Sequence, residues 1–123
     1  MRQSKYRYLM LLLAILVVGL TSACGSSNQN QVHMNETNFV QKSITIHKGE
    51  TVTLVNDSAA IHIIQNGSWM DGMQLPKSEP GAPQVNANVD GNVSEVIGPF
   101  NTAGTFHLYC TIHPDMNLTV VVD

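Results

Sequence analysis

Short runs in which apolar and polar residues alternate at period two account for most of the chain after about residue 36. Two of these runs surround Ile44 and Val52 and are separated by Lys48-Gly49-Glu50, a turn signal. Alternation of this kind is typical of strands that bury one face. Similar short runs cover residues 61–65, 85–89, 93–97, 105–110 and 117–122, and no segment repeats its apolar residues at helical spacing.

Turn-forming residues separate these runs. Asn66-Gly67 ends one of them, and Asp90-Gly91 lies between two others, where we expect a β-hairpin. The prolines and glycines from Asp71 to Pro83 predict a long surface loop. About seven to eight short strands within residues 36–123 predict an all-β fold, an antiparallel Greek-key β-sandwich.

The first 23 residues have the pattern of a targeting segment. Residues 1–8 contain three basic side chains and no acidic one, and the 12 residues 9–20 are apolar throughout. This length suits the hydrophobic region of a signal peptide and falls short of the ~20 residues that span a bilayer. We therefore expect an exported protein whose signal peptide spans residues 1–23.

The end of this segment indicates a lipid anchor. Small residues lead into Cys24 and resemble the lipobox of bacterial lipoproteins, in which the cysteine is lipidated and becomes the mature N-terminus. The resemblance implies a domain anchored to a membrane on its extracytoplasmic or periplasmic side. Ordinary signal-peptide cleavage and an uncleaved, tilted membrane anchor are the alternatives.

The segment that follows is expected to be a tether. Residues 25–35 are polar and rich in Gly, Ser, Asn and Gln, without apolar periodicity. That composition is typical of a flexible linker. We therefore expect the lipidated cysteine and the tether to span residues 24–35, His33 and Met34 to be solvated, and the folded domain to span residues 36–123.

Composition narrows the function classes. The 123-residue chain carries 6 basic and 9 acidic residues, a net charge of −3, and 43% of its residues are hydrophobic. This argues against a nucleic-acid-binding protein, which needs a basic patch to neutralise phosphates. It also argues against a disordered chain, which has fewer apolar residues. One small globular domain is expected.

The candidate chemistry lies in one short segment. Cys110, His113 and Met116 follow the expected strand 104–110, in a stretch that must turn around Pro114. Spacings of three residues in such a turn can direct a thiolate, an imidazole and a thioether at one centre. Nitrogen plus two sulfur ligands of graded softness suits copper. Zinc rarely recruits methionine, and iron–sulfur clusters need more cysteines.

A trigonal copper centre needs a second histidine. His62 is the best candidate because it lies among apolar residues after the expected strand 51–56, and a buried histidine needs a partner. A hydrogen-bonded core histidine is the ordinary alternative for His62 taken alone. Neither His47 nor His107, which lies on the opposite strand face from Cys110, is expected to be a ligand.

These residues resemble the cupredoxins, the type 1 blue-copper proteins, and most closely their plastocyanin, amicyanin and pseudoazurin members. The family's last three ligands form the pattern C-x2-H-x2-M, which Cys110, His113 and Met116 reproduce. The strand leading into the cysteine and the segment 51–56 before His62 are similar to the family as well. The resemblance implies one type 1 copper ion, cycling between Cu(I) and Cu(II), held by these three residues and His62.

The surroundings of the expected ligands depart from the family in one place. Many members follow the first histidine with asparagine, which ties the two ligand segments together, but here Ile63 follows and Thr111 lacks that partner. The backbone N–H of Ile63 could still donate to the Cys110 sulfur. Such contacts, together with Pro114 in the ligand loop, tune the potential of a metal site, and Asp115 adds charge beside it.

The resemblance implies one-electron transfer rather than catalysis. Four protein ligands leave no open position for a substrate, which a catalytic metal needs, so no enzyme is expected. His113, on an exposed loop, is the expected electron exit, as in the family. Tyr109 offers a second route, since it points to the strand face opposite Cys110; an ordinary solvent-facing tyrosine is the alternative.

A copper storage or delivery protein is the main alternative function. Met70 and Met73 near Trp69 could supply further soft ligands, although scattered methionines more often pack than bind metal. An enzyme built on a cysteine–histidine nucleophile pair would lack an evident oxyanion loop. A multicopper oxidase would need His-x-His pairs and a binuclear copper centre a second nearby cysteine, and the sequence has neither.

The charge of the mature chain indicates the kind of partner. Removal of residues 1–23 takes away Arg2, Lys5 and Arg7, which leaves three lysines against nine acidic residues, a net charge of −6. We therefore expect a membrane-tethered monomer that exchanges electrons with redox proteins through a basic docking face on the partner.

Overall fold

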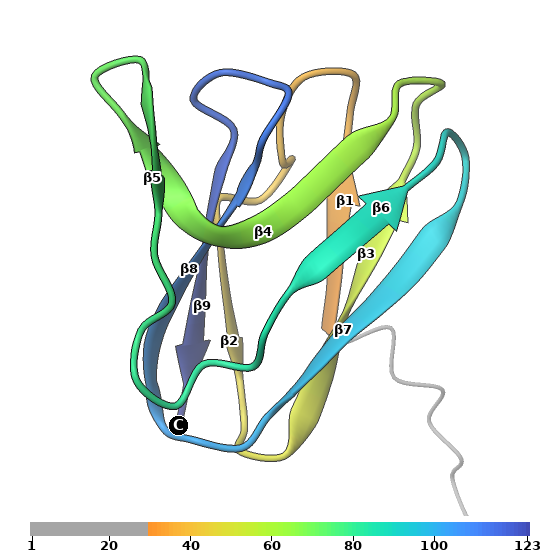
Figure 1. Ribbon diagram of the computed structural model, residues 1–123. Helices are drawn as coiled ribbons and strands as arrows, with labels where there is room; N and C mark the ends of the chain where they lie inside the picture. Colours follow the sequence, from red (N-terminus) through yellow and green to blue (C-terminus); the bar gives the residue numbers. More distant parts are fainter. Residues whose placement is uncertain (1–29) are drawn as a thin grey trace, which may run out of the picture.

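The computed structural model describes residues 30–123 (Figure 1). The expected signal peptide 1–23, the lipidated Cys24 and the tether residues 25–29 lie outside the described residues. Within residues 30–123, no helix is long and apolar enough to cross a membrane.

In residues 30–123, nine strands form two sheets that enclose one core, which confirms the all-β sandwich (Figure 1). They are β1 (Gln31–Met34), β2 (Ser43–Ile46), β3 (Glu50–Asn56), β4 (His62–Met70), β5 (Met73–Pro76), β6 (Asn86–Val89), β7 (Ser94–Phe100), β8 (Gly104–Cys110) and β9 (Asn117–Val122). One sheet has the order β1-β3-β7 and the other β2-β9-β8-β4-β5, with β6 paired to β4. The pairs β1–β3 and β2–β9 are parallel, so the sandwich is mixed rather than wholly antiparallel.

Alternate positions of the strands supply the core between the two sheets. In β3, Val52 and Leu54 are fully buried, and the residues around them are partly exposed. In β9, Leu118 and Val120 are buried in the same alternating way. Burial of one strand face is what the period-two pattern predicts.

Strand β1 lies in the segment that was expected to be a tether. It runs parallel to β3, and its residues Val32 and Met34 are fully buried in the core. The expected domain boundary at residue 36 is therefore wrong, and so is the expectation of a solvated Met34. His33, on the other face of the strand, places its Nδ1 atom 2.6 Å from the Asp57 carboxylate.

Strand β4 continues without a break through Asn66-Gly67, where the sequence predicts a turn. Gly67 has φ = 130°, and Figure 1 shows that β4 is strongly curved in its middle. The chain reverses instead at Asp71-Gly72, where φ is 51° and 74°, and returns as β5 paired to β4. The turn expected at Asn66-Gly67 is therefore wrong, and part of the expected surface loop, Met73–Pro76, is a strand.

The turn at Asp90-Gly91 does not close a hairpin, contrary to expectation. Strand β6 before it pairs with β4, and strand β7 after it pairs with β3, so the turn carries the chain from one sheet to the other. Buried Asn56 holds it in place, since its Nδ2 donates to the carbonyl oxygens of Ala60 (2.6 Å) and Asp90 (2.9 Å). A turn dipeptide shows where a chain reverses, but not which strands pair.

The connections at one end of the sandwich carry the predicted site residues. This end, the upper one in Figure 1, is formed by the connections that follow β1, β3, β6 and β8 and by the tip of the β4–β5 hairpin. We call it the site end. The start of β1 and the end of the chain lie at the opposite end (Figure 1).

Candidate metal centre

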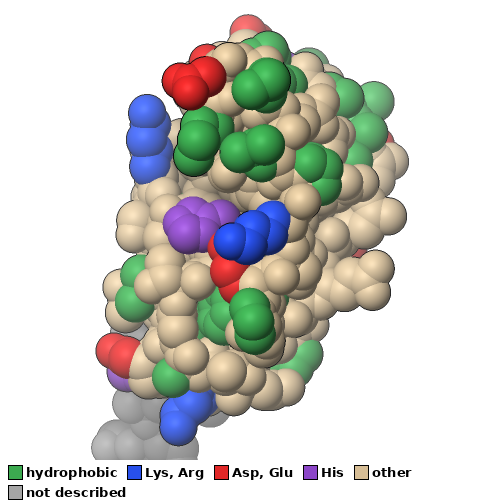
Figure 2. All heavy atoms as spheres, turned by 60° about the vertical axis from the view of Figure 1, so that its left-hand side comes forward, with side chains coloured by type: hydrophobic (Ala, Val, Ile, Leu, Met, Phe, Trp, Pro, Cys, Tyr) green, Lys and Arg blue, Asp and Glu red, His purple; other side chains and the backbone are tan. Residues whose placement is uncertain are grey.

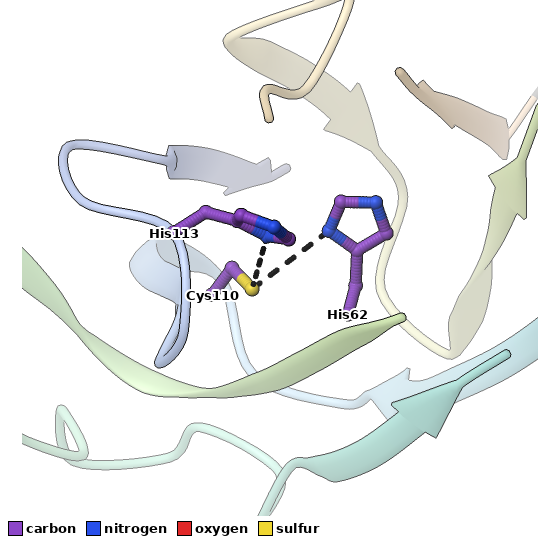
Figure 3. A group of neighbouring side chains, drawn as sticks. All are labelled: His62, Cys110 and His113. Atoms are coloured by element: carbon purple, nitrogen blue, oxygen red, sulfur yellow. Dashed lines mark hydrogen bonds between the residues drawn. The ribbon is translucent and has the colours of Figure 1, made fainter. Parts of the chain in front are cut away.

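Three side chains with metal-binding atoms meet at the site end (Figure 3). His62 begins β4, Cys110 ends β8, and His113 follows in the next loop. The pairing of Ile64 with Cys110 places the two strand ends side by side. The Nδ1 atoms of His62 and His113 lie 3.8 Å and 3.4 Å from the Cys110 sulfur. The structure thus brings together three of the four ligands predicted from the sequence.

Burial favours the neutral, unprotonated form of the His62 ring. His62 and Cys110 are fully buried, whereas His113 is half-buried. Burial lowers the pKa of His62, the nearby His113 lowers it further, and the backbone carbonyl of Asn35 opposes both. A neutral ring is therefore favoured. Its Nδ1 atom faces the sulfur, and its buried Nε2 atom makes no hydrogen bond within residues 30–123. A buried thiol between two imidazole nitrogens fits a metal ion.

The loop after β8 folds back so that Met116 returns to Cys110. The Cys110 N–H donates to the Met116 carbonyl (3.0 Å), and the Met116 N–H donates to the His113 carbonyl (3.3 Å). Asp115 closes the turn with φ = 62°, in the left-handed region. Pro114 lies at the middle of this loop, as expected. The Met116 side chain is fully buried, so the fourth predicted ligand lies inside the same end of the sandwich.

Backbone atoms tie the two ligand segments together. The Thr111 N–H donates to the Ile63 carbonyl at 2.9 Å. The possible hydrogen bond from the Ile63 N–H to the Cys110 sulfur is not present among the described residues. Ile63 and Thr111 therefore support the site through their main chains, and the link does not depend on the side chain that follows His62.

Two residues that the sequence did not single out as supports also hold the ligand segment. The Trp69 Nε1–H donates to the Cys110 carbonyl at 2.7 Å, and the Gln74 Nε2–H donates to the Thr111 carbonyl at 3.1 Å. Both residues belong to the β4–β5 hairpin, which folds over the outer side of β8. The one available signal was the single tryptophan of the chain, which lies just before the Asp71-Gly72 turn.

Tyr109 lies on the strand face opposite Cys110, as expected, but it does not face solvent. Its side chain is 1% exposed and packs edge-on against Trp69, with the ring centroids 6.3 Å apart. Its hydroxyl donates to Gln74 Oε1 at 3.3 Å, and burial raises its pKa. The alternative of a solvent-facing tyrosine is wrong, because the hairpin covers it.

The remaining histidines lie away from the cluster, as predicted. The His47 side chain is 79% exposed and contacts Asp123 at 2.6 Å. The His107 Nδ1 lies 2.7 Å from Glu79 Oε1, on the outer face of β8. Burial would raise the pKa of Glu79, but hydrogen bonds from the His107 ring and backbone outweigh it and lower that pKa.

Comparisons with known proteins agree with this site. Residues 26–123 match the family model of copper-binding proteins of the plastocyanin/azurin family. Amicyanin from Paracoccus versutus has a similar structure, with a TM-score of 0.58 and 23% identity over 79% of this chain and 83% of that one. A purple cupredoxin from Nitrosopumilus maritimus has a TM-score of 0.59 and 20% identity over 76% of this chain and 98% of that one. No curated protein matches the chain.

Copper is the metal that these donors fit. Thiolate, thioether and imidazole are the soft and intermediate ligands that copper prefers. His62, Cys110, His113 and Met116 match the ligand set of a single type 1 copper site.

Proposed function

We propose a specific role for this chain, which belongs to the plastocyanin/azurin family of copper-binding proteins, electron carriers and not enzymes. Tethered to a membrane, it carries single electrons between redox proteins outside the cytoplasm. The observation that carries the proposal is the buried Cys110 sulfur, which lies between two imidazole nitrogens at 3.4 Å and 3.8 Å.

We assign the four predicted ligands to one copper ion. His62, Cys110 and His113 would hold it as strong ligands, and Met116 as the weaker thioether ligand. Bound there, copper supplies one-electron chemistry between Cu(I) and Cu(II). The protein keeps the donors in place through the β4–β8 pairing and the backbone bonds of the loop that ends at Met116. Little movement of the donors on electron transfer is the expected result.

His113 is the proposed electron exit. Of the three clustered donors it is the one that reaches the surface. Its neighbour Ile112 and the nearby Ile61 are about half exposed, at 48% and 49%, and offer an apolar contact to a partner. Tyr109 remains the proposed second route, and because it is covered, this route would reach solvent through Trp69 rather than through the tyrosine itself.

The charge of the site end supports a basic partner. Five of the nine acidic residues lie in its connections and hairpin tip together with one lysine, Lys42, while Lys48 lies at the opposite end, so the site end carries excess negative charge. Attraction between unlike charges speeds association and weakens as salt screens it. Electron transfer to a basic partner should therefore slow with rising ionic strength, and a rate independent of salt would contradict the proposal. The five residues are Glu36, Asp57, Asp71, Asp90 and Asp115.

Tethering through Cys24 is proposed from the sequence pattern alone. In a bacterial host, the full chain should appear in the membrane fraction as a lipid-modified monomer. The variant Cys24→Ser should lose the lipid. An unmodified wild-type protein in the soluble fraction would rule out the anchor, without bearing on the copper site.

The metal proposal is tested by one visible spectrum and one voltammogram. The copper-loaded protein should show the intense visible absorption of thiolate-bound Cu(II), and Cys110→Ser should abolish it. Reversible one-electron oxidation at an electrode is expected for a carrier. Release of Cu(I) to a chelator without reversible oxidation would instead support storage or delivery. Absorption that survives in Cys110→Ser would refute the ligand assignment.

A further inference from the structure

Two methionines face each other across the tip of the β4–β5 hairpin. Met70, the last residue of β4, is paired in register with Met73, the first residue of β5. The two-residue turn between them has positive φ at both positions, as in the tight type I′ turn. Residues directly opposite in an antiparallel pair place their side chains on the same face, with Cβ atoms about 4.5–5.5 Å apart. Two thioethers are therefore held side by side.

Neither methionine belongs to the core. The Met70 side chain is 57% exposed and that of Met73 62% exposed. By contrast, Met34 in the core and Met116 in the metal centre are both fully buried. Methionine normally fills gaps in a hydrophobic core, and core packing does not account for two adjacent methionines at an exposed tip.

The hairpin presents this pair outward on a fixed support. Trp69 and Gln74 form the neighbouring register pair, and successive pairs of a hairpin point to opposite faces. Trp69 and Gln74 point inward, where they donate to the carbonyl oxygens of Cys110 (2.7 Å) and Thr111 (3.1 Å). The methionine pair must then face away from β8, at the same end of the molecule as the metal centre (Figure 1).

The surroundings of the pair suit a soft cation. Thioethers are soft donors that select Cu(I) and its analogue Ag(I) over hard cations. Asp71, exposed in the turn between the methionines, adds a negative charge that attracts a cation. Figure 2 faces this side of the molecule and shows hydrophobic side chains gathered in its upper part with acidic side chains beside them.

We propose that Met70 and Met73 form a second, surface binding site for a soft monovalent metal ion, with Cu(I) as the biological ligand. Two thioethers without a thiolate bind weakly, so the ion exchanges readily. The site is separate from the buried donors, and it requires no change of oxidation state. It would let the protein capture Cu(I) at the same end at which the buried centre lies.

Silver(I) titration of the Cu(I)-loaded protein, with methionine methyl groups labelled with ¹³C, tests this site. Ag(I) is a redox-inert probe, and Cu(I) keeps the sample diamagnetic. The methyl signals of Met70 and Met73 should shift together, while those of buried Met34 and Met116 stay in place. If only the Met116 signal moves, silver enters the buried centre and the surface site is refuted.

Leucine variants supply the matched controls. Met70→Leu and Met73→Leu keep the size and apolar character of exposed side chains, so the hairpin should fold as before. Each single variant should weaken silver binding, and the double variant should abolish it. Silver binding that is unchanged in the double variant overturns the proposal. The visible absorption of the Cu(II)-loaded double variant should match that of the wild type, which separates this site from the electron-carrier proposal.

Discussion

Gly67 is a position at which the hairpin on the outer side of β8 should be sensitive to substitution. It lies in the bend of β4, with φ = 130°. A Cβ atom added there would lie 2.4 Å from the Leu75 carbonyl oxygen, 2.9 Å from Tyr109 Cε1 and 3.0 Å from the Lys77 nitrogen. Two of these three neighbours are backbone atoms, which cannot rotate away. Gly67→Ala should therefore push the returning strand β5 off β4 and Tyr109.

The magnitude follows from two contributions. A non-glycine residue at this φ costs about 1–3 kcal/mol, and overpacking against fixed atoms adds about 1–3 kcal/mol. We expect Gly67→Ala to lower the free energy of unfolding by about 2–6 kcal/mol. Gly72→Ala is the matched control, because it also has positive φ, 74°, but no atom lies within 4 Å of its added Cβ. The control should cost about 1–2 kcal/mol.

Guanidinium unfolding of both variants measures the difference, with circular dichroism and tryptophan fluorescence as probes. Trp69 is the only tryptophan of the chain, so its emission reports directly on the hairpin. In native Gly67→Ala protein the emission should shift to the red, as the ring leaves Tyr109 and the Cys110 carbonyl. Equal midpoints for the two variants, with unshifted emission, would refute the close packing of the hairpin against β8.

Three further predictions test other parts of the fold. Met34→Ala should lower the free energy of unfolding by about 2–5 kcal/mol, as for a buried core side chain; an effect near zero in chemical denaturation would mean that β1 is a tether after all. Trp69→Phe should lower the free energy of unfolding, followed by circular dichroism, by about 1–3 kcal/mol, because the Cys110 carbonyl loses its hydrogen-bond donor. An unchanged free energy would show that water replaces the indole N–H. The folded-state pKa of Glu79 is lowered from 4.5, because the hydrogen bonds from His107 outweigh the effect of burial. The ionised carboxylate therefore adds to the free energy of unfolding above about pH 4.5, and this stabilisation is lost as the pH falls through the lower folded-state pKa. Glu79→Gln should therefore be less stable than the wild type by about 0.5–1 kcal/mol near neutral pH, and the difference should vanish in acid; a difference that is constant with pH would contradict this.

The metal centre could be predicted from the sequence because its information is local. Cys110, His113 and Met116 lie within seven residues, and their spacing alone suggests one centre. His62 is distant in sequence, but it lies among apolar residues, and a buried histidine needs a hydrogen-bond partner or a metal ion, which made it the candidate fourth ligand. The chain pattern also predicted most strands, since each buries alternate residues against the same core.

The parts that the sequence did not reveal depend on distant contacts. Strand β1 buries only Val32 and Met34 within a polar run, and pairing with β3, not local preference, makes it a strand. The dipeptide Asn66-Gly67 has a strong turn preference, yet it stays extended because the next residues pair with β5 and cover Tyr109. Local turn propensity is a weak term when such long-range pairing opposes it.

The hairpin also explains how the site dispenses with the asparagine that the resemblance led us to expect after His62. That side chain would tie the two ligand segments together, a role that Ile63 cannot take. Here the Thr111 N–H bonds to the Ile63 carbonyl, which needs no particular side chain. Trp69 and Gln74 then hold the carbonyls of Cys110 and Thr111 from outside. The ligand segment is thus held by the Ile63 backbone on one side and by the hairpin on the other, which should keep it rigid without the asparagine link. The hairpin therefore helps to position the Cys110 thiolate.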